Sequence, residues 1–218
     1  MRGIVWLLAA IFAAAPAAGA ERPGAAAVRE KVRAYRAAHE VEILREFADL
    51  LAIPNLASDT ENIRRNAERV SAMLARRGVR TELLELPGAP PIVYGELSVP
   101  GARRTLLLYA HYDGQPVDPA RWTGKPWQPV LREGPVEAGG REVAWESVKS
   151  PVNPEWLLYA RSASDDKAPV IGLATALDAL KAAKVPLSAN LKFFFDGEEE
   201  AGSPHLPAIL DKYRDRLK

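Results

Sequence analysis

Four carboxylates follow directly after a hydrophobic run near the end of the sequence. The stretch "NLKFFFDGEEEAGSPHL" spans residues 190–206, and its apolar part predicts a buried strand that delivers acidic side chains to one place. These acids are Asp196, Glu198, Glu199 and Glu200. A charge run of this kind is usually a solvated loop when nothing else accompanies it. Its interpretation therefore depends on the other polar clusters in the chain.

Two further polar clusters also follow apolar runs. His111 and Asp113 come after "LLLYA", and Asp165 and Asp166 come after "WLLYARSAS". Each has a simpler explanation, since Asp113 opens an Asp-Gly turn and the Asp pair also fits the N-terminal cap of a helix. In an α/β sheet, however, ligands bind outside the carboxyl ends of the strands. We therefore expect the three clusters to converge at one edge of the sheet.

A divalent cation would make this gathering of like charges stable. Two carboxylates about 4 Å apart repel each other by about 1 kcal/mol in water, and by several times more where solvent is excluded. The chain contains no cysteine, so any metal must be held by oxygen and imidazole. That ligand set favours Zn²⁺, and Mn²⁺ or Co²⁺ are also compatible. A carboxylate bridging two ions would make a two-metal hydrolase, with an unligated Glu as proton acceptor.

The elements expected around these residues form an α/β domain. Apolar residues at helical spacing predict helices over 25–51, from Asp59 to about Gly78, and over 168–184. Strand-like runs cover 79–86, 91–99, 104–113, 156–159 and 191–195. Residues 115–155 are rich in Pro, Gly and Trp, which predicts a long irregular connection of a kind that is usually functional.

The order of these elements predicts how the sheet is built. Strand 156–159, helix 168–184 and strand 191–195 are expected to form a parallel βαβ unit. The apolar run 106–110 predicts a strand buried on both faces. The expected architecture is a mostly parallel sheet with helices on both faces.

Composition and charge argue against a nucleic-acid or membrane partner. Lys and Arg number 29 against 28 Asp and Glu, which gives a formal net charge of +1. No overall field therefore attracts an anionic polymer or an anionic lipid surface.

The first twenty residues have the pattern of a secretory signal peptide. Arg2 precedes an apolar run that ends in an A-x-A pattern at residues 18–20. A membrane anchor is disfavoured because the run is short and Pro16 interrupts it. We expect residues 1–20 to be removed, leaving residues 21–218 as an exported protein, periplasmic or secreted, without a membrane anchor.

Together, the three motifs resemble those of dinuclear zinc peptidases. "LLLYAHYDGQPVDPARW", "LYARSASDDKAPV" and "FFFDGEEEAGS" are similar in order and spacing to the motifs of the carnosinase, aminoacylase and glutamate carboxypeptidase type, clan MH. The resemblance covers roughly residues 58–217. It implies two zinc ions, a homodimer, and hydrolysis of dipeptides or short peptides by a metal-activated water with a Glu base.

The resemblance also implies a role for each site residue. His111 corresponds to a terminal ligand of the first metal, and Asp113 to the carboxylate that orients it. Asp165 corresponds to the bridging carboxylate, followed by a peptide bond that is typically cis. Glu199 corresponds to the general base, and Glu200 to a terminal ligand of the second metal.

The sequence departs from the family pattern in two respects. "ARS" at 160–162 stands where Gly-Arg-Gly is common, and Ala168 replaces a usual Gly. The family's two remaining ligands, an Asp and a late His, are not found, nor is its inserted dimerising domain. His205 is expected to be a surface or capping residue. We therefore expect residues 21–218 to be the N-terminal portion of the catalytic domain, in a truncated form.

Three alternative functions stay open. The chain could be a catalytically inactive fragment with at most weak metal binding, because ligands and the lid domain are missing. N-acyl amino acids fit the same metal chemistry as peptides, so a deacylase is a second alternative. An exported solute-binding domain has the least support, because binding alone needs no set of ligand, bridge and base.

Overall fold

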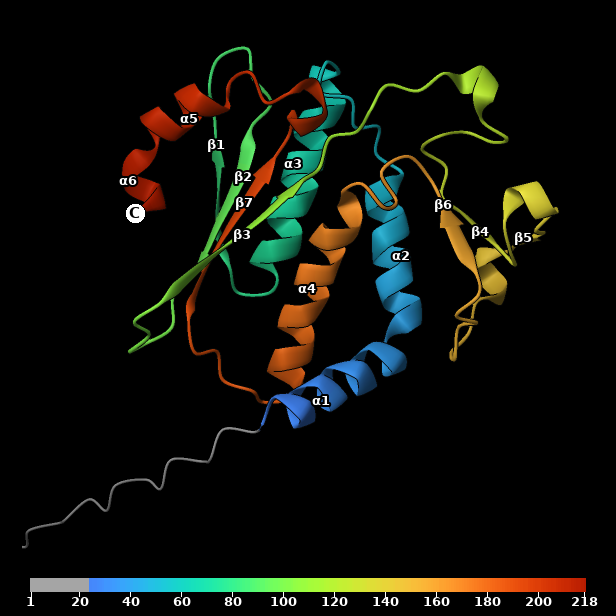
Figure 1. The fold of residues 1–218 in the computed structure, drawn as a ribbon, viewed down its shortest axis with the longest axis horizontal. Helices are drawn as coiled ribbons and strands as arrows, with labels where there is room; N and C mark the ends of the chain where they lie inside the picture. The colour runs from blue at the N-terminus through green and yellow to red at the C-terminus, as the bar shows by residue number, and fades with distance from the viewer. Residues whose placement is uncertain (1–23) are drawn as a thin grey trace, which may run out of the picture.

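The computed structural model describes residues 24–218 and shows a sheet covered by helices (Figure 1). The expected signal peptide lies outside the described residues. Within 24–218, no helix is both long and apolar enough to span a bilayer. The α/β class expected from the sequence is confirmed.

The helices and strands lie close to their predicted positions. The helices are α1 (Ala25–Ala38), α2 (Glu40–Leu51), α3 (Thr60–Ala75), α4 (Lys167–Ala182), α5 (Leu206–Lys212) and α6 (Arg214–Leu217). The strands are β1 (Arg80–Leu84), β2 (Ile92–Leu97), β3 (Thr105–His111), β4 (Val130–Arg132), β5 (Glu142–Val143), β6 (Leu157–Tyr159) and β7 (Asn190–Asp196). The helix predicted over 25–51 is two helices, because the backbone leaves the helical range at His39, between α1 and α2, with φ −123° and ψ 16°.

The main sheet is mixed, whereas a mostly parallel sheet was predicted. Its strand order is β1-β2-β7-β3. β3 and β7 run parallel, but β1 pairs antiparallel with β2, and β2 pairs antiparallel with β7. The short connection 85–91 between β1 and β2 explains part of the difference, because a parallel pair needs a crossover of a dozen or more residues.

The predicted βαβ unit starting at strand 156–159 was wrong. β6 belongs to a second, small antiparallel sheet of order β5-β4-β6. The parallel crossover instead joins β3 to β7, and α4 lies on it. β4 and β5 also place some regular structure inside the connection 115–155, which was predicted to be irregular.

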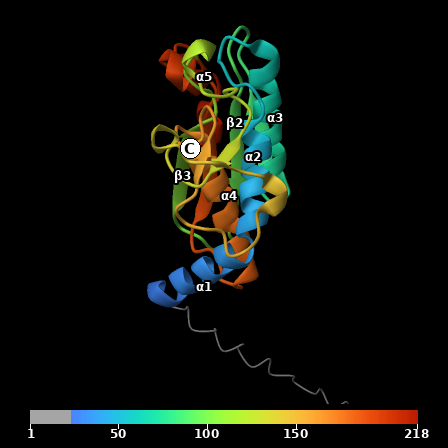
Figure 2. The same cartoon turned by 90° about the vertical axis from the view of Figure 1, so that its right-hand side faces the viewer.

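Helices cover both faces of the main sheet, as predicted (Figure 2). Phe193 and Phe195 of β7 face the layer of α2, α3 and α4, while Phe194 faces α5 and α6. Successive side chains of a strand point to opposite faces, so all three rings are buried. Each such ring contributes roughly 1.5 to 3 kcal/mol to folding. β7 therefore packs against the helices on both faces of the sheet.

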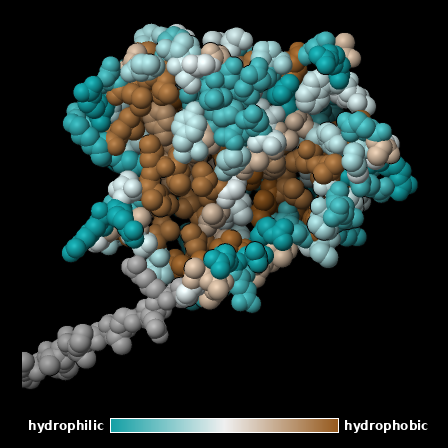
Figure 3. All heavy atoms as spheres, in the orientation of Figure 1, coloured by the Kyte–Doolittle hydropathy of each residue, from teal (hydrophilic) through white to brown (hydrophobic). Residues whose placement is uncertain are grey.

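The strand predicted to be buried on both faces is exposed. In β3, Leu106, Leu107 and Tyr109 are 52%, 58% and 50% exposed. β3 lies at the edge of the described sheet with β7 as its neighbour there, so nothing covers its outer side. Figure 3 shows hydrophobic atoms gathered where Figure 1 places β3. Only its carboxyl end, at Ala110 and His111, is buried.

Candidate metal centre

Three elements bring one ligand candidate each to the carboxyl edge of the sheet. His111 ends β3, Asp165 lies in the turn before α4, and Glu200 lies in a 3-10 turn after β7. The parallel register pairs His111 with Asp196, so β3 and β7 end at the same level. Donor atoms of His111, Asp165 and Glu200 all lie within 4.8 Å of one another. The convergence predicted for these residues is confirmed, while their individual roles stay predictions.

The two nitrogens of His111 each face a carboxylate. Nδ1 lies 3.2 Å from Oδ1 of Asp113, and Nε2 lies 2.9 Å from Oδ1 of Asp165. Burial lowers the pKa of His111, but the hydrogen bonds with Asp113 and Asp165 and the charge of Asp166 together raise it to about 9. Asp113 holds Nδ1 of His111, and Nε2 faces Asp165, another ligand candidate. Metal-binding histidines have the same arrangement, with one ring nitrogen held by a carboxylate and the other facing the metal.

Asp113 also holds the turn that carries the two glutamates. Its side chain is fully buried, and Oδ1 and Oδ2 accept hydrogen bonds from the backbone N–H groups of Glu199 and Glu200, each at 3.1 Å. Sequence analysis missed these contacts, since the partners are 86 and 87 residues away along the chain. It also missed Gln115, whose Nε2 donates to Oε2 of Glu200 at 2.6 Å.

The turn before α4 is tied to β3 by an aspartate. The peptide bond between Asp165 and Asp166 is cis, as predicted. Oδ2 of Asp166 accepts a hydrogen bond of 3.1 Å from the backbone N–H of His111. Asp166 occupies the N-cap position of α4, but its side chain makes no capping hydrogen bond. The simple capping interpretation of this Asp pair is therefore not supported.

A buried lysine next to this turn fixes the start of α4. Lys167 is fully buried, and Nζ donates to the carbonyls of Leu50 at 2.9 Å and Ile53 at 3.1 Å. Burial lowers the pKa of Lys167 to about 7. These contacts lock the N-terminus of α4 against the C-terminus of α2, and no local sequence pattern pointed to them.

The acidic run after β7 is a structured turn rather than a solvated loop. Asp196 is buried and accepts hydrogen bonds from the backbone N–H of Glu198 and the hydroxyl of Ser203. Glu198 is buried as well, and both of its oxygens contact His205. His205 starts α5 and remains outside the group of ligand candidates, as predicted. The two buried acids shape the turn, and this leaves Glu199 44% exposed.

Comparison with known proteins identifies the family. The sequence model of peptidase family M20/M25/M40 matches residues 107–217, which include all the site residues described above. The chain belongs to peptidase family M20/M25/M40.

Several relatives within the M20 family match most of this chain. Human Beta-Ala-His dipeptidase is 29% identical over 207 residues, which cover 88% of this chain and 36% of that protein. The crystal structure of human carnosine dipeptidase 1 matches with a TM-score of 0.67 and 25% identity, covering 89% of this chain and 39% of the other. The crystal structure of an M20 family metallo-carboxypeptidase from Sulfolobus solfataricus matches with a TM-score of 0.63 and 30% identity, covering 81% of this chain and 35% of the other. The chain spans little more than a third of the length of these relatives.

The donor set of this M20 chain fits a divalent cation. One imidazole nitrogen and two carboxylate oxygens converge, and the sequence offers no thiolate. Such ligands suit zinc, whose catalytic sites commonly use three protein ligands and keep one position open for water or substrate. Like-charged Asp165 and Glu200 would otherwise repel each other at this distance.

Proposed function

We propose that this chain provides metal-binding and catalytic residues of a peptidase that hydrolyses the amide bond of dipeptides or short peptides. One observation carries the proposal: His111, Asp165 and Glu200 place their donor atoms within 4.8 Å of one another. Membership of a peptidase family and the dipeptidases among the relatives support the same reaction. Zinc is the proposed metal, with Mn²⁺ or Co²⁺ compatible with the same ligands.

The proposed reaction divides the work among the site residues. Bound divalent ions would polarise the substrate carbonyl and activate water near neutral pH. Asp113 keeps His111 in position, and Asp165 and Glu200 would supply carboxylate ligands to the metal. Glu199 has a half-exposed carboxylate with Oε2 3.6 Å from Nε2 of His111. We assign it the proton transfer, from the attacking water to the leaving amine.

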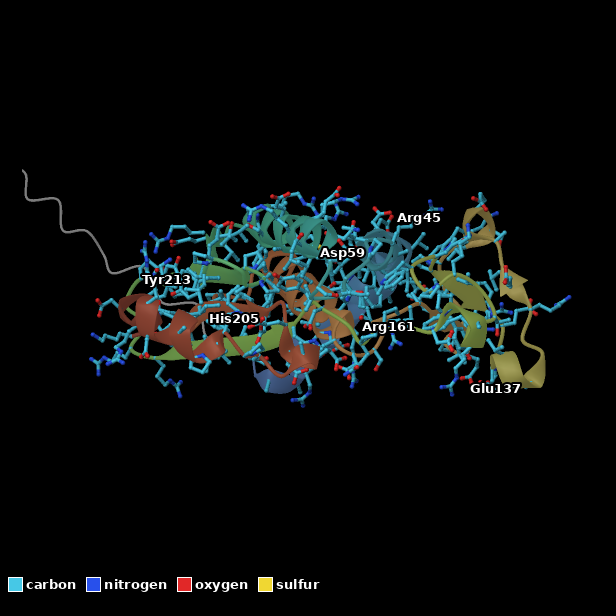
Figure 4. All side chains as sticks on the ribbon, turned by 90° about the horizontal axis from the view of Figure 1, so that it is seen from above. Arg45, Asp59, Glu137, Arg161, His205 and Tyr213 are labelled. Atoms are coloured by element: carbon cyan, nitrogen blue, oxygen red, sulfur yellow. The ribbon has the colours of Figure 1, made fainter. Side chains whose placement is uncertain are left out.

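Replacing Glu199 tests the assignment of the base. Glu199→Gln should lower kcat for dipeptides by about 10² to 10⁴, because the amide cannot take a proton. Zinc content, measured by atomic emission, should stay at the wild-type value. Glu137→Gln serves as control, since Glu137 is exposed and lies at the opposite end of the molecule from Tyr213 (Figure 4). Full turnover, or a loss of activity that parallels a loss of zinc, contradicts the assignment.

A substrate panel separates this proposal from its alternatives. The purified chain with Zn²⁺ is assayed against mixed dipeptides and N-acyl amino acids. Turnover of dipeptides excludes the inactive-fragment hypothesis for this chain, and turnover of N-acyl amino acids alone identifies a deacylase instead. Export and dimer formation remain predictions, from the first twenty residues and from the family resemblance respectively.

A further inference from the structure

A buried asparagine lies between the two segments that carry His111 and Asp165. Asn55 follows α2 and is fully buried. Its Nδ2 donates to the carbonyl of Tyr112 and to the hydroxyl of Ser162, both at 2.9 Å. One amide group therefore joins the end of β3 to the turn before α4.

Two other polar atoms of Asn55 also accept hydrogen bonds. Oδ1 accepts a hydrogen bond of 2.9 Å from the indole N–H of Trp127, in the long connection 115–155. Its backbone carbonyl accepts a hydrogen bond of 2.9 Å from Gly114. The packing is close, because a Cβ on Gly114 would lie 3.0 Å from Nδ2 of Asn55 and would overlap the hydroxyl of Ser162.

The partners of Asn55 flank the ligand candidates. Tyr112 and Gly114 directly precede and follow Asp113, the residue whose carboxylate faces His111. Ser162 begins the turn that leads to Asp165, and its φ of 62° lies in the left-handed region that favours glycine. The hydrogen bond from Asn55 holds this serine hydroxyl in place.

We propose that Asn55 is a positioning residue that sets the separation of His111 and Asp165 and couples it to Trp127. The inference rests on the proposed metal site. Asn55 contacts neither His111 nor Asp165, so its expected effect is on the affinity of the site for metal, through the positions of these two residues. Nothing in the sequence "IPNLAS" around Asn55 indicates a metal-site residue.

Asn55→Ala and the control Asn190→Ala test this role. Asn190 is partly buried at the start of β7, and its side chain accepts a hydrogen bond from the backbone N–H of Val99 and donates one to the hydroxyl of Thr105, at the opposite end of the strand from the ligand segments. Zinc affinity is measured by competition with a chromophoric chelator, and the melting temperature is measured without metal. Both variants should melt earlier than the wild type, but only Asn55→Ala should bind zinc about tenfold more weakly.

A second pair of variants does not depend on the folding of Asn55→Ala. Trp127→Phe removes the indole donor to Asn55 while keeping an aromatic ring at this position, and should weaken zinc binding about threefold. Trp145→Phe is its control, because the Trp145 indole donates to the carbonyl of Pro129, away from Asn55. Zinc binding by Trp145→Phe should equal that of the wild type.

The outcomes separate this inference from the proposed function. If the wild type binds zinc and both Asn55→Ala and Trp127→Phe bind it equally well, the positioning role is wrong and the metal site stands. Equal weakening in the Asn190 and Trp145 controls also overturns the role, because the effect is then general. If the wild-type chain binds no zinc, the proposed metal site fails and this inference fails with it.

Discussion

Asp113 connects three parts of the site through two oxygen atoms. Oδ1 faces Nδ1 of His111 and accepts from the N–H of Glu199, while Oδ2 accepts from the N–H of Glu200. A carboxylate can accept all of these hydrogen bonds, whereas an amide cannot, since its NH₂ group would face an N–H donor. The carboxylate of Asp113 therefore holds the turn of Glu199 and Glu200 in place and also orients the imidazole of His111.

Asp113→Asn should therefore weaken metal binding more than it disturbs the fold. We expect zinc affinity to fall by about 10- to 100-fold, as for other partners of metal-bound histidines. Isothermal titration of the metal-free protein with zinc measures it. Asp118→Asn is the control, because Asp118 accepts a hydrogen bond only within its own exposed turn. Unchanged affinity in Asp113→Asn would show that this carboxylate does not support the site.

The ligand candidates were predictable from the sequence, but their supports were not. The runs before His111 and Glu200 are β3 and β7, so a local pattern places these two residues at the same edge of the main sheet. Asp165 follows β6 of the other sheet and reaches that edge through the turn before α4. Lys167 instead reaches Leu50, 117 residues away, and nothing near either residue indicates that contact. Long-range hydrogen bonds of this kind depend on the packed fold, which local patterns do not contain.

At the scale of elements, one arginine ties three helices together. Arg77, just after α3, contacts Glu46 of α2 and Asp178 of α4, each at 2.7 Å, and is 9% exposed. Nη1 also donates to the carbonyl of Met73 at 2.9 Å. α2 leads into Asn55, and α4 begins beside Asp165. This ion-pair group therefore stabilises the helical layer on which the metal site is built.

Glu46→Gln should destabilise the fold at neutral pH but not at acid pH. Burial raises the pKa of Glu46, but the hydrogen bonds and charges of Arg77 and Arg76 lower it below its ordinary value of 4.5. A lowered folded pKa means that the stabilisation is present above pH 4.5 and is lost as pH falls through the folded pKa. We expect a loss of about 1.5 to 3 kcal/mol at neutral pH from urea unfolding, since the hydrogen bonds are charged.

The control for this prediction is an exposed ion pair. Glu68→Gln breaks the contact with Arg64, where both side chains are more than half exposed, and should cost about 0.5 kcal/mol or less. A Glu46→Gln effect that stays constant on acidification, or that equals the Glu68→Gln effect, contradicts the role given to Arg77.

Strand partners were harder to predict than strands. The apolar runs located β3, β6 and β7 to within two residues, because hydrophobic pattern is a local property. It did not show that β6 pairs with β4 in a separate sheet, or that β3 lies at an edge. The exposed leucines of β3 therefore looked like buried ones, since pairing and edge position are decided by the whole fold.

At the scale of the whole molecule, β3 presents an apolar edge to solvent. An uncovered, hydrophobic edge strand is prone to pair with another chain. Leu107→Glu should therefore reduce self-association of the purified chain, measured by light scattering, and the new carboxylate would lie beside Lys192 in the β3–β7 register. Leu210→Glu is the control, because Leu210 is an exposed leucine of α5 away from this edge. An equal reduction in both variants would show that the edge is not the cause.

The central claim is that His111, Asp165 and Glu200 together hold a divalent ion. The most direct measurement is an anomalous difference map, collected at the zinc absorption edge from crystals grown with zinc. We expect a peak among the donor atoms of these three residues, and no peak there in crystals of His111→Ala. A map without a peak among them, or with the zinc bound only elsewhere on the chain, would contradict the claim.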